Sequence, residues 1–217
     1  MRRPAADLTQ LAATLREHGH ASMAVNHPVE AITSFTQALE TVQRAGREHD
    51  TALILISLGE ALAATGQEVR AVARLRQART ILSTGPDFYQ QARAQAALGA
   101  ALARYPQVAT AHLEHALKIM RRLGALPEQA AILGTLGDVA RDHGQPGEAI
   151  RRYRQALAIL PGTHPAAGRL RSQIATLADD GRTGDRCEQP DPAVSRNSTG
   201  EDMRKETNAA VPGWDRA

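Results

Sequence analysis

Apolar residues recur along most of this chain at spacings of three and four, the pattern of a helix with one buried face. One motif has leucine and glycine at its centre, three and four positions after its first residue, and a small or apolar residue at its end. Its copies are Leu55-x-x-Leu58-Gly59-x-x-Leu62, Gln95-x-x-Leu98-Gly99-x-x-Leu102 and Leu133-x-x-Leu136-Gly137-x-x-Ala140, with a weaker copy at Leu15-x-x-His18-Gly19-x-x-Ser22. The motif predicts four helices of one kind.

A second motif follows each copy of the first: alanine, then a large residue after four positions and another alanine after seven. The four sets are Ala31, Phe35 and Ala38; Ala71, Leu75 and Ala78; Ala109, Leu113 and Ala116; and Ala149, Tyr153 and Ala156. Small residues at the glycine and alanine positions let two helices approach closely, and the large residue fills the space that remains. The alternation therefore predicts four helical hairpins, with left-handed turn residues at Asn26, Gly66 and Gly144.

The predicted helices cover about 8–25, 28–45, 49–65, 67–83, 87–104, 107–123, 127–143 and 146–160. A further helix at 164–179 has its apolar residues on one stripe, as a helix that covers the open end of a repeat array needs. We therefore expect residues 1–180 to form one all-α domain. Beyond it the chain is rich in Gly, Pro, Ser, Thr and mixed charges, so we expect 181–217, which include Trp214, to be a disordered tail.

These residues resemble the tetratricopeptide repeat (TPR) signature, W-x2-L-G-x2-Y followed by A-x3-F, A and P. The fourth copy matches best, with Ala140 in the tyrosine position and Leu133, Leu136, Gly137, Ala149, Tyr153, Ala156 and Pro161 at the others. The resemblance covers repeats near 12–45, 52–85, 92–123 and 130–163 and implies a right-handed superhelical solenoid. Gly19, Gly59 and Gly99 are forty residues apart and Gly137 follows after thirty-eight, a longer period than usual. Repeats of this length resemble those of kinesin light chains and of bacterial regulatory proteins.

Composition and charge narrow the class of protein only a little. The 217 residues are 42% hydrophobic but only 3% aromatic, with a formal net charge of +3, which is typical of Ala- and Leu-rich helices with a solvated charged surface. The single cysteine, Cys187, excludes a disulfide or a thiolate zinc cage within the chain. No apolar stretch has the length of a signal peptide core or a membrane span, so we expect a cytoplasmic protein that does not contact membranes.

No sequence motif predicts catalysis. G-x-x-x-x-G-K-[ST], G-x-G-x-x-G, H-E-x-x-H and G-x-S-x-G are absent, so we expect no enzyme activity and no cofactor. His112 and His115 lie one helical turn apart, but no third ligand has an obvious spacing, and we expect no metal site. Arginines of the second helices, among them Arg70 and Arg74, could contact phosphates. Without neighbouring aromatic residues to stack on bases, we do not expect nucleic acid to be the partner.

The resemblance also implies a binding surface, because in this family the first helices of successive repeats line a concave groove that receives a peptide or a helix. The matching positions are Arg16, His20 and Met23; Leu53, Ile56 and Glu60; Arg93 and Arg104; and Asp138, Arg141 and Asp142. They grade from apolar through positive to mixed, which suggests a ligand with an apolar anchor and a carboxylate. The carboxylate clamp that some members use for chaperone tails is not expected, because His20, Glu60 and Ala97 replace its asparagines and a basic residue.

The sequence therefore predicts a non-catalytic module or adaptor that binds a protein or peptide. The alternative is a sensor or regulatory segment related to bacterial transcription regulators, acting through a separate DNA-binding protein or domain. The first repeat has no obvious preceding cap, so self-association through that end stays open.

Overall fold

A computed structural model describes the backbone of residues 4–187 and the side chains of residues 7–179. Within this range the chain forms nine helices. They are α1 (Pro4–Ala24), α2 (Pro28–Arg44), α3 (Glu48–Ala64), α4 (Glu68–Leu82), α5 (Phe88–Ala101), α6 (Pro106–Leu123), α7 (Leu126–Asp142), α8 (Pro146–Ile159) and α9 (Pro165–Cys187). Met1–Asp179 is one compact unit and Asp180–Ala217 a second, of which only the last turns of α9 are described.

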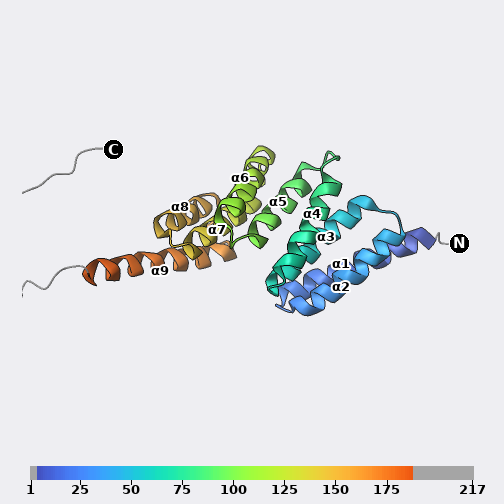
Figure 1. Ribbon diagram of the computed structural model, residues 1–217, viewed down its shortest axis with the longest axis horizontal. Helices are drawn as coiled ribbons and strands as arrows, with labels where there is room; N and C mark the ends of the chain where they lie inside the picture. Colours follow the sequence, from blue (N-terminus) through green and yellow to red (C-terminus); the bar gives the residue numbers. More distant parts are fainter. Residues whose placement is uncertain (1–3, 188–217) are drawn as a thin grey trace, which may run out of the picture. The chain divides into compact units, whose positions relative to one another are not determined.

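The helices pair into four hairpins, α1–α2, α3–α4, α5–α6 and α7–α8, and each second helix also packs on the first helix of the next hairpin (Figure 1). This succession is the all-α solenoid expected from the two alternating motifs. α9 packs on the fourth hairpin, where Leu170 is 2% exposed and Gln173 Nε2 donates to Asp138 Oδ1 of α7 at 3.0 Å. Within residues 4–187 no helix combines the length and the apolar character that crossing a membrane requires.

Most predicted helix boundaries are confirmed to within a few residues, but three ends differ. α1 begins at Pro4, four residues before its predicted start. α5 ends at Ala101 rather than 104, because tight turns close the short connection and Pro106 already begins α6. α9 continues to Cys187, eight residues past its predicted end, since isolated glycines such as Gly181 cost a helix only about 1 kcal/mol each. The predicted tail thus begins inside a helix, and the rest of it, with Trp214, lies outside the described residues.

The signature glycines have the packing role that the motifs predict. A methyl group at Gly59 would lie only 2.5 Å from Leu75 Cγ, so any side chain there would force the two helices of the hairpin apart. The large residues that occupy the freed space are at most 1% exposed. The four pairs are Gly19 with Phe35, Gly59 with Leu75, Gly99 with Leu113 and Gly137 with Tyr153.

The turns inside three of the hairpins also follow the sequence. Asn26, Gly66 and Gly144 have φ values of 61°, 73° and 70°, as predicted for left-handed helix ends. Pro28 and Pro146 occupy the first turns of α2 and α8, where a missing backbone N–H costs no helical hydrogen bond.

Buried apolar residues form two clusters that meet at α5. The first joins α1–α4 with Ala94, Ala97, Leu98 and Ala101, and the second joins Ala92 with α6–α9. Each hairpin is therefore stabilised mainly by its own pairing and its immediate neighbours.

Candidate functional site

The first-helix face, the surface formed by α1, α3, α5 and α7, carries most of the residues predicted to contact a ligand. They lie on four helices, except for Arg104, which follows the end of α5. The others are Arg16, His20 and Met23 on α1; Leu53, Ile56 and Glu60 on α3; Arg93 on α5; and Asp138, Arg141 and Asp142 on α7.

Charged and polar side chains of α1, α3 and α5 meet on this face through long contacts. His20 stacks edge-on against Phe35, with ring centroids 5.1 Å apart, and its Nε2 lies 3.4 Å from Ser57 Oγ on α3. Arg93 Nη2 on α5 lies 3.6 Å from Glu60 Oε1 on α3. A guanidinium has five N–H donors, so Arg93 retains donors for a further acceptor.

Two groups in this cluster have shifted pKa values. Desolvation lowers the pKa of His20, and Arg16 and Arg93 lower it further against the opposing effect of Glu17. Desolvation raises the pKa of Glu60 and Arg93 offsets this only in part, although 41% of the Glu60 side chain is exposed. A new hydrogen bond or charge from a ligand has a large effect on a partly desolvated carboxylate.

Asp138 on α7, by contrast, is held by several protein groups through one of its carboxylate oxygens. Its Oδ1 accepts hydrogen bonds from Tyr153 Oη at 2.8 Å, Gln173 Nε2 at 3.0 Å and Arg141 Nη1 at 3.1 Å. Arg141 also pairs with Asp142 at 2.8 Å. Burial and the bond to Asp138 raise the pKa of Tyr153, so its hydroxyl stays a donor. These residues hold α7, α8 and α9 together and leave little capacity for a ligand.

One prediction for this face needs correction, and one predicted residue lies apart from the others. Ile56 is 0% exposed, so the prediction that it contacts a ligand is wrong. α3 lies between α1 and α5 and is covered on most sides, which buries a position that the repeat pattern alone marks as open. Arg104 lies beyond the end of α5 and pairs with Glu68 of α4 at 3.3 Å, and its contact with a ligand stays a prediction. Met23 and Leu53 are half-buried and could contact a ligand.

A row of polar contacts that the repeat motifs did not predict joins successive first helices and α9. The pairs are His20 with Ser57, Glu60 with Arg93, Tyr89 with Glu128, and Asp138 with Gln173. Three of them are 37, 39 and 35 residues apart in sequence, close to one repeat period. A search for complementary polar residues one repeat apart would have found them.

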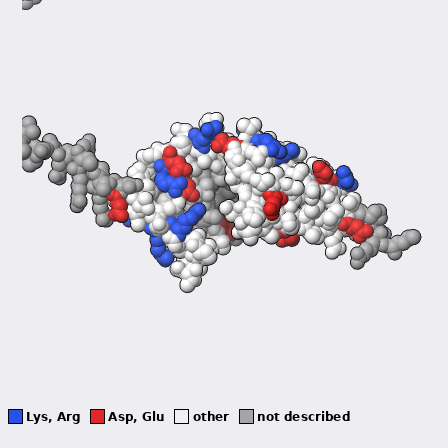
Figure 2. Space-filling view, turned by 90° about the horizontal axis from the view of Figure 1, so that it is seen from below, with Lys and Arg blue, Asp and Glu red and all other residues white. Residues whose placement is uncertain are grey.

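Some of the other charged groups on the surface are paired with neighbours of opposite charge. Acidic and basic residues lie in small mixed groups on the face shown in Figure 2. Arg152 on α8 lies 2.6 Å from Glu114 and 2.7 Å from Glu148, so this second-helix arginine has no charge to spare for phosphates. His112 is hydrogen bonded to Gln95 at 2.7 Å. The described side chains include no group of three or more His, Cys, Asp or Glu residues placed to hold a metal ion.

Comparisons with known proteins agree with this architecture. A tetratricopeptide repeat family model matches residues 90–162, and no curated protein matches the chain. The chain is similar to the nearly identical TPR-like repeats of a Podosopora anserina protein of the kinesin light chain type, with 21% identity, a TM-score of 0.63 and coverage of 83% of this chain and 91% of that one.

Two Rap structures are similar over part of their length. The Rap protein complexed with Competence and Sporulation Factor has a TM-score of 0.73 and 18% identity, covering 79% of this chain and 49% of that one. The Rap conjugation gene regulator of plasmid pLS20, in complex with the Phr* peptide, has a TM-score of 0.69 and 18% identity, with coverage of 79% and 48%. This chain thus spans about half the length of these Rap proteins. Residues 90–162 are tetratricopeptide repeats, and the described chain as a whole has the fold of a TPR-type solenoid.

Proposed function

We propose that this chain is a non-catalytic module that binds an extended peptide or protein segment on its first-helix face. The observation that carries the proposal is the unequal quality of the contacts between first helices. They are long between α1, α3 and α5, at 3.4 and 3.6 Å, and short between α5, α7 and α9, at 2.7 and 3.0 Å. Long contacts position polar groups without using their full hydrogen-bonding capacity. These groups therefore stay available to a ligand.

The ligand that fits the part of the face formed by α1, α3 and α5 has an apolar side chain and a carboxylate. Met23 and Leu53 are half-buried apolar residues on α1 and α3. Arg93 holds Glu60 only at 3.6 Å, and a direct, two-point bond to a ligand carboxylate would be stronger than that contact. The Rap proteins with similar folds are complexed with a factor and a peptide, which supports a peptide as the class of partner.

The proposal is tested with peptides selected by display on the full chain, whose dissociation constants are then measured by fluorescence anisotropy. We expect Arg93→Glu and Leu53→Asp each to weaken binding at least about tenfold, or about 1.4 kcal/mol. The matched control is Arg74→Glu on α4, an exposed arginine of the second helices. Among the described side chains it makes one hydrogen bond, at 3.5 Å to Gln77. Selected peptides that bind both face variants as tightly as the wild type would place the binding site elsewhere.

A second candidate is a regulatory segment in the same cytoplasmic setting that transmits peptide binding to a DNA-binding protein. Similarity to the Rap conjugation gene regulator favours it. In that case a DNA-binding protein co-purifies with the chain, and a selected peptide changes the amount retained. The adaptor function holds if no DNA-binding protein co-purifies, and if other proteins co-purify with the wild type but not with Arg93→Glu or Leu53→Asp.

Self-association through the N-terminal end stays a prediction. Leu11 on α1 is 51% exposed on the first helix of the array. Sedimentation velocity of the wild type and of Leu11→Glu checks it: we expect a concentration-dependent dimer in the wild type alone.

A further inference from the structure

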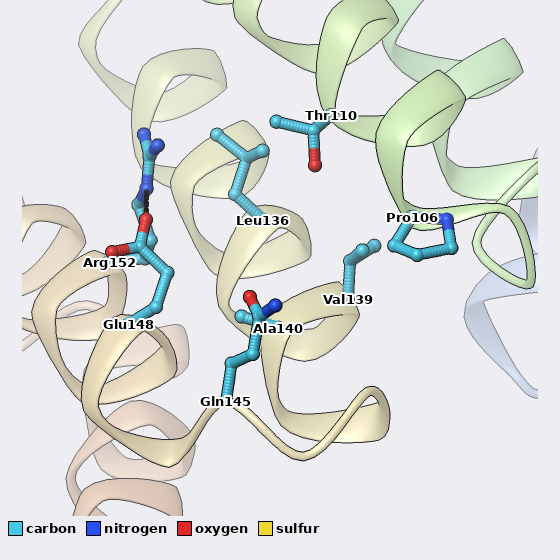
Figure 3. A pocket seen from close by; sticks show the side chains of 8 residues that line it. All are labelled: Pro106, Thr110, Leu136, Val139, Ala140, Gln145, Glu148 and Arg152. Carbon is cyan, nitrogen blue, oxygen red and sulfur yellow. Dashed lines mark hydrogen bonds and ion pairs between the residues drawn. The ribbon is translucent and has the colours of Figure 1, made fainter. Parts of the chain in front are cut away.

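A pocket of about 330 Å³ lies where α6, α7 and α8 meet, and none of the residues predicted to contact a ligand lines it. Its apolar lining comes from α7 and from the start of α6, and polar side chains of α6, α8 and the α7–α8 connection complete it (Figure 3). The lining residues are Pro106, Thr110, Leu136, Val139, Ala140, Gln145, Glu148 and Arg152.

The pocket is located where two positions of the repeat carry small side chains. When the hairpins are aligned on their motif glycines and alanines, Ala140 corresponds to Leu62 and Thr110 to Ile32. Leu62 is 1% exposed and Ile32 packs against the first core cluster, so both fill space in their own part of the solenoid. The smaller pair leaves that space open between α6, α7 and α8.

Two neutral polar groups point into the open space from opposite sides (Figure 3). Thr110 on α6 makes no hydrogen bond through its hydroxyl among the described residues. Helical threonines elsewhere bond to the carbonyl four residues earlier, as Thr36 does at 2.7 Å and Thr135 at 3.1 Å. Thr110 Oγ1 is thus free to bind a group in the pocket.

Gln145 is the second free group, on the wall formed by the α7–α8 connection. Its side-chain amide has no hydrogen-bond partner among the described residues. The corresponding Gln67 donates to Thr65 at 2.9 Å and accepts from Arg70. The difference leaves a donor and an acceptor facing Thr110 across the pocket.

The charged groups of the pocket are already paired. Glu148 accepts hydrogen bonds from Arg151 and Arg152, both at 2.7 Å, and Arg152 also pairs with Glu114. A charged ligand would have to break these ion pairs, so the site favours a neutral group with an apolar body.

We propose that this pocket receives the phenol ring of a tyrosine side chain on a partner protein. The ring would cover Leu136, Val139 and Ala140, and its hydroxyl would meet Gln145, whose amide can accept and donate. Thr110, on the opposite wall, would be left for a polar group of the attached backbone. A cavity of about 150 Å³ is enough for a benzene ring, so 330 Å³ holds a phenol and part of the attached backbone. Aromatic rings with one polar tip are suited to sites with an apolar interior and a wet rim.

The test measures binding of p-cresol, toluene and N-acetyl-tyrosinamide to the full chain by ligand-observed NMR titration. We expect saturable binding of p-cresol and N-acetyl-tyrosinamide, and p-cresol to bind several-fold more tightly than toluene. The filled variant, Thr110→Ile with Ala140→Leu, introduces the residue types found at Ile32 and Leu62. It should weaken p-cresol binding at least about tenfold. Ala111→Leu, at an exposed neighbouring position on α6, is the matched control and should leave binding unchanged.

A second variant separates shape from hydrogen bonding and does not depend on filling the pocket. Gln145→Leu should keep toluene binding and abolish the preference for p-cresol. Equal p-cresol binding by the wild type and the filled variant, or no saturable binding at all, overturns the proposal. Binding of p-cresol without N-acetyl-tyrosinamide overturns the protein partner in favour of a free phenol. Arg93→Glu should leave all three titrations unchanged, so this site and the first-helix face can fail independently.

Discussion

Gly137 and Gly134 lie one turn apart on α7, but their surroundings differ sharply. Gly137 is pressed against the ring of Tyr153, whereas the nearest atom to a Cβ built at Gly134 is Leu170 Cδ2 at 3.7 Å. The first glycine is required by close packing between helices, and the second only lowers helix propensity.

Alanine substitutions at these two glycines should therefore have opposite effects. We expect Gly137→Ala to lower the free energy of unfolding by about 1–3 kcal/mol, through overpacking against Tyr153. Gly134→Ala should be neutral or raise it by up to about 1 kcal/mol. Urea denaturation followed by circular dichroism measures both, and equal losses would contradict the packing role of Gly137.

Glu60 and Glu148 should affect the pH dependence of stability with opposite signs. Hydrogen bonds from Arg151 and Arg152 lower the pKa of Glu148, so its stabilisation is present above the ordinary glutamate pKa of 4.5 and is lost as the pH falls. Burial raises the pKa of Glu60, so its charged form opposes folding increasingly as the pH rises through that raised value. Thermal melts between about pH 4 and 8 should show Glu148→Gln losing stability at neutral pH and Glu60→Gln gaining it. Shifts of the same sign in both variants would refute these environments.

Individual residues also mark the limit of prediction from the sequence. The glycine and large-residue pairs were predictable, because sterics fix both at a constant spacing. Ile56 was not, since its burial depends on how closely α1 and α5 cover α3. The free groups of Thr110 and Gln145 depend on three helices that are far apart in sequence, and only the small residue in place of the signature tyrosine pointed to that pocket.

At the level of helices, the local sequence predicted most boundaries. Left-handed residues such as Gly66 and Gly144 and prolines at helix starts act within one turn, so they can be read without tertiary structure. The end of α5 and the length of α9 were missed because composition alone did not resolve a short connection or a helix that tolerates isolated glycines.

α9 should stabilise the fourth hairpin without stabilising the distant ones. Leu170 is 2% exposed in the second core cluster, so Leu170→Ala should cost about 2–5 kcal/mol. Hydrogen exchange should then increase in α7, α8 and α9 while α1–α4 keep their protection, since repeats contact only neighbours. The exposed Thr176→Ala on the same helix is the control. Uniform loss of protection along the chain would show that the solenoid unfolds as one unit.

Across the whole described chain, the proposed peptide site and the proposed phenol pocket belong to different parts of the solenoid. The polar groups with long contacts on the first-helix face lie on α1, α3 and α5, and the pocket lies between α6, α7 and α8. The family pattern placed most candidate residues on first helices. The pattern could not show which polar pairs between helices are long and which are short, because these distances depend on side-chain packing between repeats.

This separation predicts that damage to the fourth hairpin spares peptide binding. Gly137→Ala should destabilise α7 and α8 and change the affinity for a selected peptide by less than about twofold at a temperature where the protein stays folded. Anisotropy titration checks this, and a large loss of affinity would mean that the fourth hairpin forms part of the peptide site.

The most direct test of peptide binding on the first-helix face is a two-dimensional amide NMR titration of the full chain with a display-selected peptide. We expect the largest shift changes in residues 16–23 of α1, 53–60 of α3 and 89–97 of α5, with the outer faces of α4 and α6 unchanged. Changes centred on α4, α6 or α8 instead would contradict the account.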